Sequence, residues 1–335
     1  MSALAEPTTP VKTAAPWREA IQPYARPDLR RTALDIATSV VPYLAMLVVT
    51  YQLLDVSVLL ALAVAPLTAG FLLRTFILFH DCTHGSLFHQ KRTNRVVGTI
   101  LGLLLFMPFA SWGHSHAMHH ATAGDLDRRG HGDVATLTVE EYRARSPLGR
   151  LAYRLFRNPL VMFGLGPLLA FVIAPRRVPA GARPRIRRAI IGTNIALTVI
   201  VTTICLTVGW WQYLLVQWPA VWVAASTGIF LFYVQHQFED AYWESGDSWD
   251  FGEAALRGSS FLDLPPVLRW FTGNIGYHHV HHLSARVPNY NLKRAHEDLD
   301  LFREVPVLTL RQALRAPRCK LWDEHERRMV GFAAA

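Results

Sequence analysis

Two long stretches of the chain, residues 32–73 and 189–256, contain no lysine or arginine. Each stretch holds two uncharged apolar runs, and each run is long enough to cross a hydrocarbon core of about 30 Å. The four runs are residues 36–54, 56–73, 189–208 and 211–235. We therefore expect an all-α integral membrane protein whose four transmembrane helices form two hairpins, with short external loops near residues 51–57 and 207–211.

The positive charge of the chain predicts which side of the membrane each loop occupies. All 34 lysines and arginines lie outside the two stretches, and the net charge is +9. Cytoplasmic segments of membrane proteins are enriched in these residues, so both termini and the segment between the hairpins should be cytoplasmic. The basic face would meet anionic lipid head groups. Nucleic-acid binding is not expected, because the basic residues flank the spans and do not form a separate domain.

Ten of the fifteen histidines fall in three clusters that together occupy 17 residues. The clusters are HDCTH at 80–84, HSHAMHH at 114–120 and HHVHH at 278–282. Crowded imidazoles repel as cations and waste hydrogen bonds as neutral groups, so we expect them to face a metal ion and not to be ordinary core or surface histidines. On a helix, His278, His281 and His282 stand at i, i+3 and i+4 and share one face.

Helix length brings a further histidine to the same level. A helix over residues 56–79 would be about 36 Å long, so its last turns should project into the cytoplasm with His80 and His84. The run 211–235 has a similar excess and is followed by His236. His236 is therefore a candidate ligand, the alternative being a cationic cap at the end of the helix.

Acidic residues near the clusters are candidate partners for the imidazoles. Glu239 and Asp240 could reach back to His236 if that helix continued. Asp81, Asp125 and Asp127 could accept hydrogen bonds from ligand histidines, or could simply be solvated.

Two shorter apolar runs, residues 96–112 and 160–174, are at or below the length of a span. If the first crossed the bilayer, the first two histidine clusters would lie on opposite sides of the membrane. If the second crossed, His236 would be separated from His120 in the same way. We expect both runs to be interfacial or re-entrant helices, the alternative being six true spans.

The number of histidines indicates the metal. Zinc sites use three or four ligands, and the chain contains no HExxH motif. Soluble di-iron proteins use ExxH motifs, but no Glu in this chain has a His three residues later. Eight or nine histidines suit two six-coordinate irons, so we expect an all-histidine di-iron centre at the membrane surface.

The clusters HDCTH, HAMHH and HHVHH resemble the three histidine boxes, HxxxH, HxxHH and HxxHH, of membrane fatty acid desaturases. The resemblance covers about residues 35–300 and is closest to bacterial acyl-lipid desaturases of the delta-5 and delta-12 (omega-6) kind. The longer stretches that carry it are AGDLDRRGHGDVATLTVEEY, RLFRNPLVMFGLGP, FYVQHQFEDAYW and GNIGYHHVHHLSARVPNYNL.

By this resemblance, nine histidines are iron ligands, eight from the boxes and His236 as the ninth. The eight are His80, His84, His116, His119, His120, His278, His281 and His282. His114 and His279 fall outside the box pattern and are not included.

The resemblance also implies an activity and its partners. The enzyme would use molecular oxygen and two non-haem irons to introduce a cis double bond into the acyl chain of a membrane lipid, held in a narrow apolar channel. Electrons would come from ferredoxin or a flavodoxin-like protein. The chain has no HPGG haem motif, so this donor would be a separate protein.

Two other classes of function stay open. The same histidine scaffold supports hydroxylases, ketolases and alkane monooxygenases, although the sequence outside the boxes favours a desaturase. A metal transporter or sensor would need ligands or charges at mid-membrane depth, whereas these histidines cluster at the ends of the expected spans.

The remaining expectations concern location and domain organisation. Three scattered cysteines without a CxxC motif indicate free thiols in a reducing compartment, and residues 1–16 read as a disordered tail without a signal peptide. We expect the bacterial cytoplasmic (inner) membrane, with both termini and the active site in the cytoplasm. The expected segments are 1–34 (cytoplasmic tail and anchor), 35–79 (first transmembrane hairpin), 80–188 (cytoplasmic and interfacial, with boxes 1 and 2), 189–235 (second hairpin) and 236–335 (cytoplasmic cap with box 3).

Overall fold

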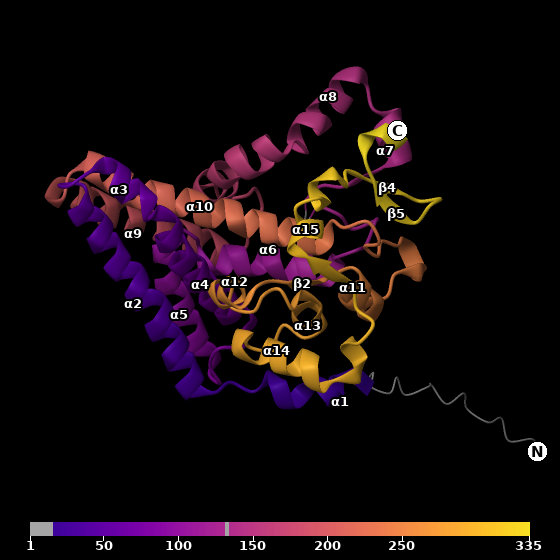
Figure 1. Cartoon of the computed structure of the whole chain (residues 1–335), viewed down its shortest axis with the longest axis horizontal. Coiled ribbons are helices and arrows are strands. Elements are labelled where there is room, and N and C mark those ends of the chain that lie inside the picture. The colour runs from indigo at the N-terminus through magenta and orange to yellow at the C-terminus, as the bar shows by residue number, and fades with distance from the viewer. Residues whose placement is uncertain (1–15, 131–133) are drawn as a thin grey trace, which may run out of the picture.

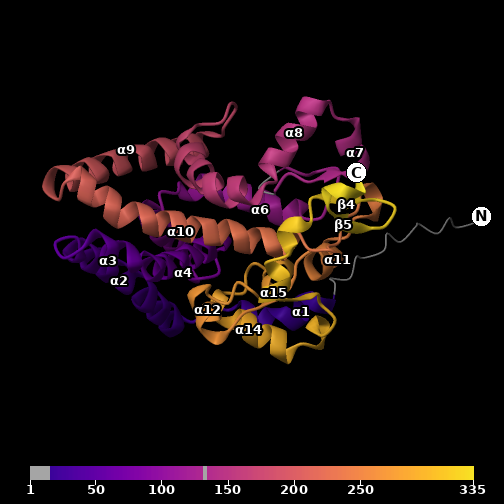
Figure 2. The same cartoon turned by 45° about the horizontal axis from the view of Figure 1, so that its top comes forward.

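The computed structural model describes residues 16–130 and 134–335, so residues 1–15 of the tail expected at residues 1–16 lie outside the described residues. The protein is mostly helical. Long helices occupy one side of the molecule, and short helices and strands occupy the other (Figures 1 and 2). The long helices and the shorter elements therefore occupy different parts of the described chain.

Within the described residues, four helical segments are long and apolar enough to cross a membrane, as predicted. They are α2 (Leu29–Leu53), α3 with α4 (Val58–Ala63 and Ala65–His84), α9 (Pro184–Thr207) and α10 (Trp210–His236). The Asp28 side chain caps α2 by accepting hydrogen bonds from the amides of Arg30 and Arg31. The break between α3 and α4 falls next to Pro66, which has no amide hydrogen to donate.

Two further helix pairs are sharply bent. Helix α5 (Lys91–Leu104) meets α6 (Phe109–Thr122) at 102°, after Phe106 with a φ of 57° and Pro108. Helix α8 (Pro147–Phe156) meets the segment Val161–Arg176 at 59°. This segment consists of the π-helical turns η2 (Val161–Leu165) and η3 (Leu168–Ile173) and the 3-10 turn η4 (Ala174–Arg176). By length and composition, each pair could be one broken span or a re-entrant loop, which gives up to six spans.

The rest of the described chain consists of short elements. The α-helices are α1 (Pro16–Ile21), α7 (Val139–Ala144), α11 (Phe251–Arg257), α12 (Pro266–Phe271), α13 (His278–Leu283), α14 (Asn289–Asp298) and α15 (Leu310–Ala313). The 3-10 turns are η1 (Gln22–Ala25), η5 (Gly246–Ser248), η6 (Asp300–Phe302), η7 (Ala316–Arg318) and η8 (Phe332–Ala334).

The described part of the chain also contains five short strands, which the all-α prediction missed. They are β1 (Leu137–Thr138), β2 (Phe261–Asp263), β3 (Val307–Thr309), β4 (Leu321–Asp323) and β5 (Arg328–Val330). Strands β1, β4 and β5 form one sheet in that order, and β2 pairs with β3 in another. The pairs β1–β4 and β2–β3 are parallel and join distant parts of the chain, so local periodicity could not reveal them.

A buried arginine joins the end of α10 to these short elements. Arg157 is fully buried, and its guanidinium donates five hydrogen bonds to neutral oxygens. The acceptors are the Ala135 carbonyl, the Thr136 hydroxyl, the Tyr233 hydroxyl, the Gln237 amide oxygen and the Cys319 carbonyl, at 2.8–3.2 Å. Because Gln237 follows directly after His236, this arginine holds the end of α10 against the C-terminal segment.

Candidate metal centre

Four helices bring all nine sequence-predicted histidines together. Helix α4 carries His80 and His84 in its last two turns, α6 carries His116, His119 and His120, α10 ends at His236, and α13 carries His278, His281 and His282. Their side chains form two groups, and the candidate ligand nitrogens within each group lie within 4.8 Å of one another.

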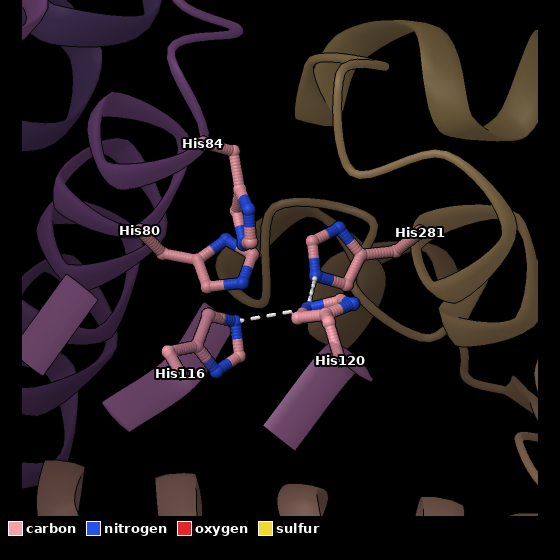
Figure 3. Close-up of side chains that lie close together, drawn as sticks. All are labelled: His80, His84, His116, His120 and His281. Atoms are coloured by element: carbon pink, nitrogen blue, oxygen red, sulfur yellow. Dashed lines mark hydrogen bonds between the residues drawn. The ribbon is translucent and has the colours of Figure 1, made fainter. Parts of the chain in front are cut away.

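The first group contains five histidines, His80, His84, His116, His120 and His281 (Figure 3). Their rings point toward a common centre from α4, α6 and α13. The Nε2 atom of His120 lies 3.1 Å from Nε2 of His116 and 2.9 Å from Nε2 of His281. Such mutually facing ring nitrogens are the arrangement in which a cation can accept several imidazole lone pairs.

The second group contains four histidines, His119, His236, His278 and His282. Nε2 of His236 lies 3.2 Å from Nε2 of His119 and 2.9 Å from Nε2 of His278. The two groups are adjacent, since the His120 and His282 rings stack with centroids 4.3 Å apart. The structure therefore places His236 beside box histidines, as a ligand would be, and not at an isolated helix end.

The shared helix face of the three box-3 histidines had suggested that they face a single centre. In the structure they face two centres. On α13, His278 and His282 join the second group and His281 joins the first. Helix α6 shows the reverse arrangement, in which His116 and His120 join the first group and His119 the second. In each HxxHH box, the i, i+4 pair thus serves one group and the histidine at i+3 serves the other.

The histidines of α13 are held in their neutral form. Burial lowers the pKa of His278, His281 and His282 well below the ordinary histidine value, and nearby histidines lower it further. A neutral imidazole has a free lone pair, which is the form that binds a metal ion.

The donor set fits a transition metal. Among the described residues, neither group includes a carboxylate or a thiolate, so each metal would see only imidazole nitrogen. The Nε2 atoms of His84 and His282 are buried and have no hydrogen-bond partner among the described residues. Buried polar atoms normally have a partner, and a bound ion would supply one. Imidazole suits iron, copper, zinc and nickel.

The polar contacts behind the histidines differ from several expectations. His236 Nδ1 lies 3.0 Å from the Gly258 carbonyl, which can accept a hydrogen bond from it. Helix α10 ends at His236, and the Glu239 carboxylate lies 3.3 Å from Arg328 Nη1. Glu239 and Asp240 were expected to reach back to His236 only if the helix continued, and this condition is not met.

The three candidate aspartates have separate roles. Asp81 Oδ1 lies 3.4 Å from His80 Nδ1, and its Oδ2 accepts hydrogen bonds from the backbone and side-chain amides of Asn289. Asp125 accepts from Arg128 and from the amides of Asp127 and Arg128, and Asp127 accepts from the Gly246 amide. Asp81 thus lies beside a site histidine, whereas Asp125 and Asp127 organise a loop.

The two excluded histidines of the clusters stay outside both groups. His114 is exposed. His279 is fully buried, with its Nε2 atom 2.9 Å from Nδ1 of His296 and its ring against Phe302. Burial lowers the pKa of His279 to about 3, so this residue is a neutral core group.

An apolar cavity of about 540 Å³ opens onto both groups. It is lined by His80 and His116 of the first group and by His278 of the second. Gln235 also lines it, is only 1% exposed, and has an Oε1 atom without a hydrogen-bond partner among the described residues. Gln235 was not predicted, although it is a polar residue next to His236 in an otherwise apolar run.

Comparison with known proteins identifies the family. Residues 57–309 match the sequence model described as fatty acid desaturase. The chain belongs to the fatty acid desaturase family. It is 46% identical over 311 residues to a fatty acid desaturase of Bacillus subtilis, a match that covers 93% of this chain and 88% of that protein.

Two relatives from Synechocystis are more distant. An sn-1 oleoyl-lipid 12-desaturase is 26% identical over 76% of this chain and 74% of its own length. An sn-1 acyl-lipid omega-3 desaturase (ferredoxin) is 28% identical over 66% of this chain and 62% of its own length. The family resemblance of the histidine boxes is confirmed, and this desaturase is an oxidoreductase with histidine groups that could hold metal ions.

Proposed function

We propose that this desaturase introduces a cis double bond into the acyl chain of a membrane lipid, beside two irons bound by the nine histidines. The observation that carries this proposal is the apolar cavity, which touches histidines of both groups. An acyl chain in this cavity would lie next to both irons. The relatives from Synechocystis, whose names specify acyl lipids, support the same substrate class.

The five histidines of the first group would hold one iron and the four of the second would hold the other. Six-coordinate irons would keep positions that no histidine fills. Bound there, the irons would supply the redox chemistry that uses molecular oxygen, two electrons and two protons to remove two hydrogens from adjacent methylenes.

The residues of the chain itself position the substrate and keep water away. The His116 ring stacks on Trp112, with centroids 4.4 Å apart, and both residues line the cavity. Phe76, whose ring packs against Trp112, and Phe232, whose ring packs against His119, also line the cavity. Among the described residues, no charged side chain lines the cavity, so it favours a hydrocarbon chain and excludes a charged head group.

We infer that the electrons come from a separate ferredoxin or a flavodoxin-like protein. The support is the name of one relative, which specifies ferredoxin, and the absence of an HPGG haem motif from this sequence. The net charge of +9 would favour an acidic redox partner.

We further propose that α2 with α3–α4, and α9 with α10, form two transmembrane hairpins in the bacterial cytoplasmic membrane. The bent pairs α5–α6 and α8–η4 would then be re-entrant or interfacial. The termini and both histidine groups would lie on the cytoplasmic side, and the segments 1–34, 35–79, 80–188, 189–235 and 236–335 would have the roles expected above. The support is parity, because histidines that precede and follow each bent pair belong to the two adjacent groups.

Expression in a bacterium of known lipid composition tests the activity. The lipids should gain a cis double bond, which mass spectrometry can locate, and purified protein should contain about two irons. Replacing His84, His120 or His282 by Ala should abolish the product while the protein stays in the membrane. The control is His325→Ala at an exposed position, which should keep normal activity. One tightly bound zinc without iron-dependent activity would exclude the di-iron proposal, and a hydroxylated product would indicate a hydroxylase.

A further inference from the structure

One wall of the cavity is much thinner than the others. The α4 and α10 residues that line it are buried or half-buried, because these helices pack against each other and against α2. Five lining residues are exposed, and four of them lie in the segment from the end of α8 to the start of η4. These four are Phe156, Leu169, Ala170 and Ala174. This segment therefore separates the cavity from the outside by a single layer of chain.

The outer surface of the thin wall is apolar. Leu160 is 82% exposed, Leu165 58% and Leu169 55%. On α8, Leu148, Leu151 and Leu155 are also exposed at helical spacing. A surface of this kind is stable next to lipid and unfavourable next to water. The wall thus faces the bilayer.

The thin wall is attached to α10 by two side-chain hydrogen bonds. Trp222 Nε1 donates to the Gly164 carbonyl at 2.9 Å, and Ser226 Oγ donates to the Phe163 carbonyl at 2.8 Å. Both carbonyls belong to the π-helical turn η2, whose backbone pattern is less stable than that of an α-helix. The Phe163 ring also packs against Phe230 and Tyr233 of α10. Opening this wall would break two hydrogen bonds and these ring contacts, whereas opening the α4–α10 wall would separate two long helices.

The charge around this wall has one sign. Residues 142–238 contain eleven arginines and no aspartate or glutamate. Arg150 and Arg154 lie on the exposed surface of α8. Arg176 is the last residue of η4, and Arg177 follows it. Both ends of the thin wall therefore carry positive charge without nearby acidic sequence, which favours anionic phosphate head groups at the membrane surface.

We propose that a phospholipid with an anionic head group passes its acyl chain sideways from the bilayer into the cavity, through the η2–η3 wall. The head group stays outside, among the arginines near α8 and η4. The inference rests on the proposed function and adds to it the class of lipid and the route. A water-soluble acyl thioester does not fit this route, because the thin wall faces lipid.

Gly166 offers a way to block the passage. A Cβ atom added there would lie 3.6 Å from Ile229 Cδ1, so a larger side chain would fill the space between the wall and α10. The matched control is Gly192 on α9, which is exposed and where an added Cβ meets no atom within 4 Å. Ser226→Ala should act in the opposite direction, because it removes one of the two side-chain hydrogen bonds between the wall and α10.

The experiment uses the full chain in phosphatidylglycerol vesicles in which some lipids carry a light-activated diazirine on one acyl chain. Mass spectrometry after illumination measures labelling of the peptides that contain Trp112 and Phe232. We expect Gly166→Phe to lower this labelling about tenfold, Gly192→Phe to leave it unchanged, and Ser226→Ala to raise it. Phosphatidylcholine carrying the same chain should label the cavity more weakly.

Two outcomes would overturn the inference. Unchanged labelling in both Gly166→Phe and Ser226→Ala would exclude this route, and a soluble diazirine acyl thioester that labels the wild type better than the phospholipid would exclude the lipid class. Equal labelling by phosphatidylcholine and phosphatidylglycerol would exclude a preference for an anionic head group. If wild-type protein makes no double bond in cells, the proposed function fails, but labelling still reports the route. If wild-type protein is active and the cavity peptides of Gly166→Phe and Ser226→Ala are labelled as in the wild type, only the proposed route fails.

Discussion

The spacing of an HxxHH box explains how one short helix can serve two metal ions. Residues at i and i+4 lie almost above one another on a helix, whereas the residue at i+3 is turned to the other side of that line. His116 and His120 therefore face the first group and His119 the second, and on α13 the assignment is reversed. Two helices that lie on opposite sides of the pair of groups can thus each contribute to both.

Replacing His236 by Asn tests the ninth ligand. Asn can keep the hydrogen bond that Nδ1 makes to the Gly258 carbonyl, but it has no nitrogen in the place of Nε2. We expect the purified variant to fall from about two irons to about one per chain and to lose activity, because the second group would keep only three histidines. Elemental analysis measures this directly. Two irons and a normal yield of double bonds would limit the site to the eight box histidines.

Replacing His279 by Ala should separate packing from metal binding within the same box. His279 is buried against Phe302 and pairs with His296, and it belongs to neither group. The variant should lose about 2 kcal/mol of stability through the cavity and the lost hydrogen bond, and its melting temperature should fall. Its iron content should stay the same. Loss of iron while the protein still melts at the wild-type temperature would contradict this assignment.

The candidate site could be predicted from sequence because its residues are concentrated in short motifs. The division of the histidines into five and four could not, since it depends on how α6 and α13 face each other in the folded chain. The end of the apolar run at residue 235 did mark the end of α10, which is His236. Whether the helix continued far enough for Glu239 and Asp240 to reach back depended on the contacts of the folded chain.

At the level of elements, hydropathy identified the long helices and missed the short strands. Strand β1 has two residues, and its partner β4 begins more than 180 positions later, so no local pattern marks the pair. The break between α3 and α4 and the π-helical turns η2 and η3 were also not predicted. The turn η2 contacts α10, including the hydrogen bonds from Trp222 and Ser226, and such contacts between distant parts of the chain leave no local pattern in the sequence.

Replacing Arg157 by Lys tests how firmly the end of α10 is held. Lys keeps the charge but cannot reproduce the planar guanidinium that donates five hydrogen bonds. We expect a loss of about 2 kcal/mol, measured as a lower melting temperature in detergent. The matched control is Arg150→Lys on the exposed surface of α8, which should change stability by less than about 0.5 kcal/mol. Equal melting temperatures for both variants would mean that the buried network does not stabilise the fold.

At the scale of the whole molecule, helix length and histidine position explain each other. The α3–α4 segment and α10 each have 27 residues, more than a bilayer core requires, and each ends in a site histidine. Both metal-binding groups can therefore lie just beyond the hydrocarbon while the cavity extends between the helices. The four long helices could be predicted from sequence because their hydropathy is continuous, whereas the bent pairs were ambiguous because each run is short.

The membrane topology gives the last prediction. If the bent pairs return to the same side, reporters fused after Asp125, Arg183 and Ala335 should all give a cytoplasmic signal, and a reporter inserted at Gly209, between α9 and α10, should give an external one. The reason is parity, because His84, His120 and His281 belong to one group and must lie on one side of the membrane. An external signal at Arg183 would mean that one bent pair crosses. Since His120 precedes α8–η4 and His236 follows α9 and α10, an external signal would also place the adjacent histidine groups on opposite sides, which their stacked rings forbid.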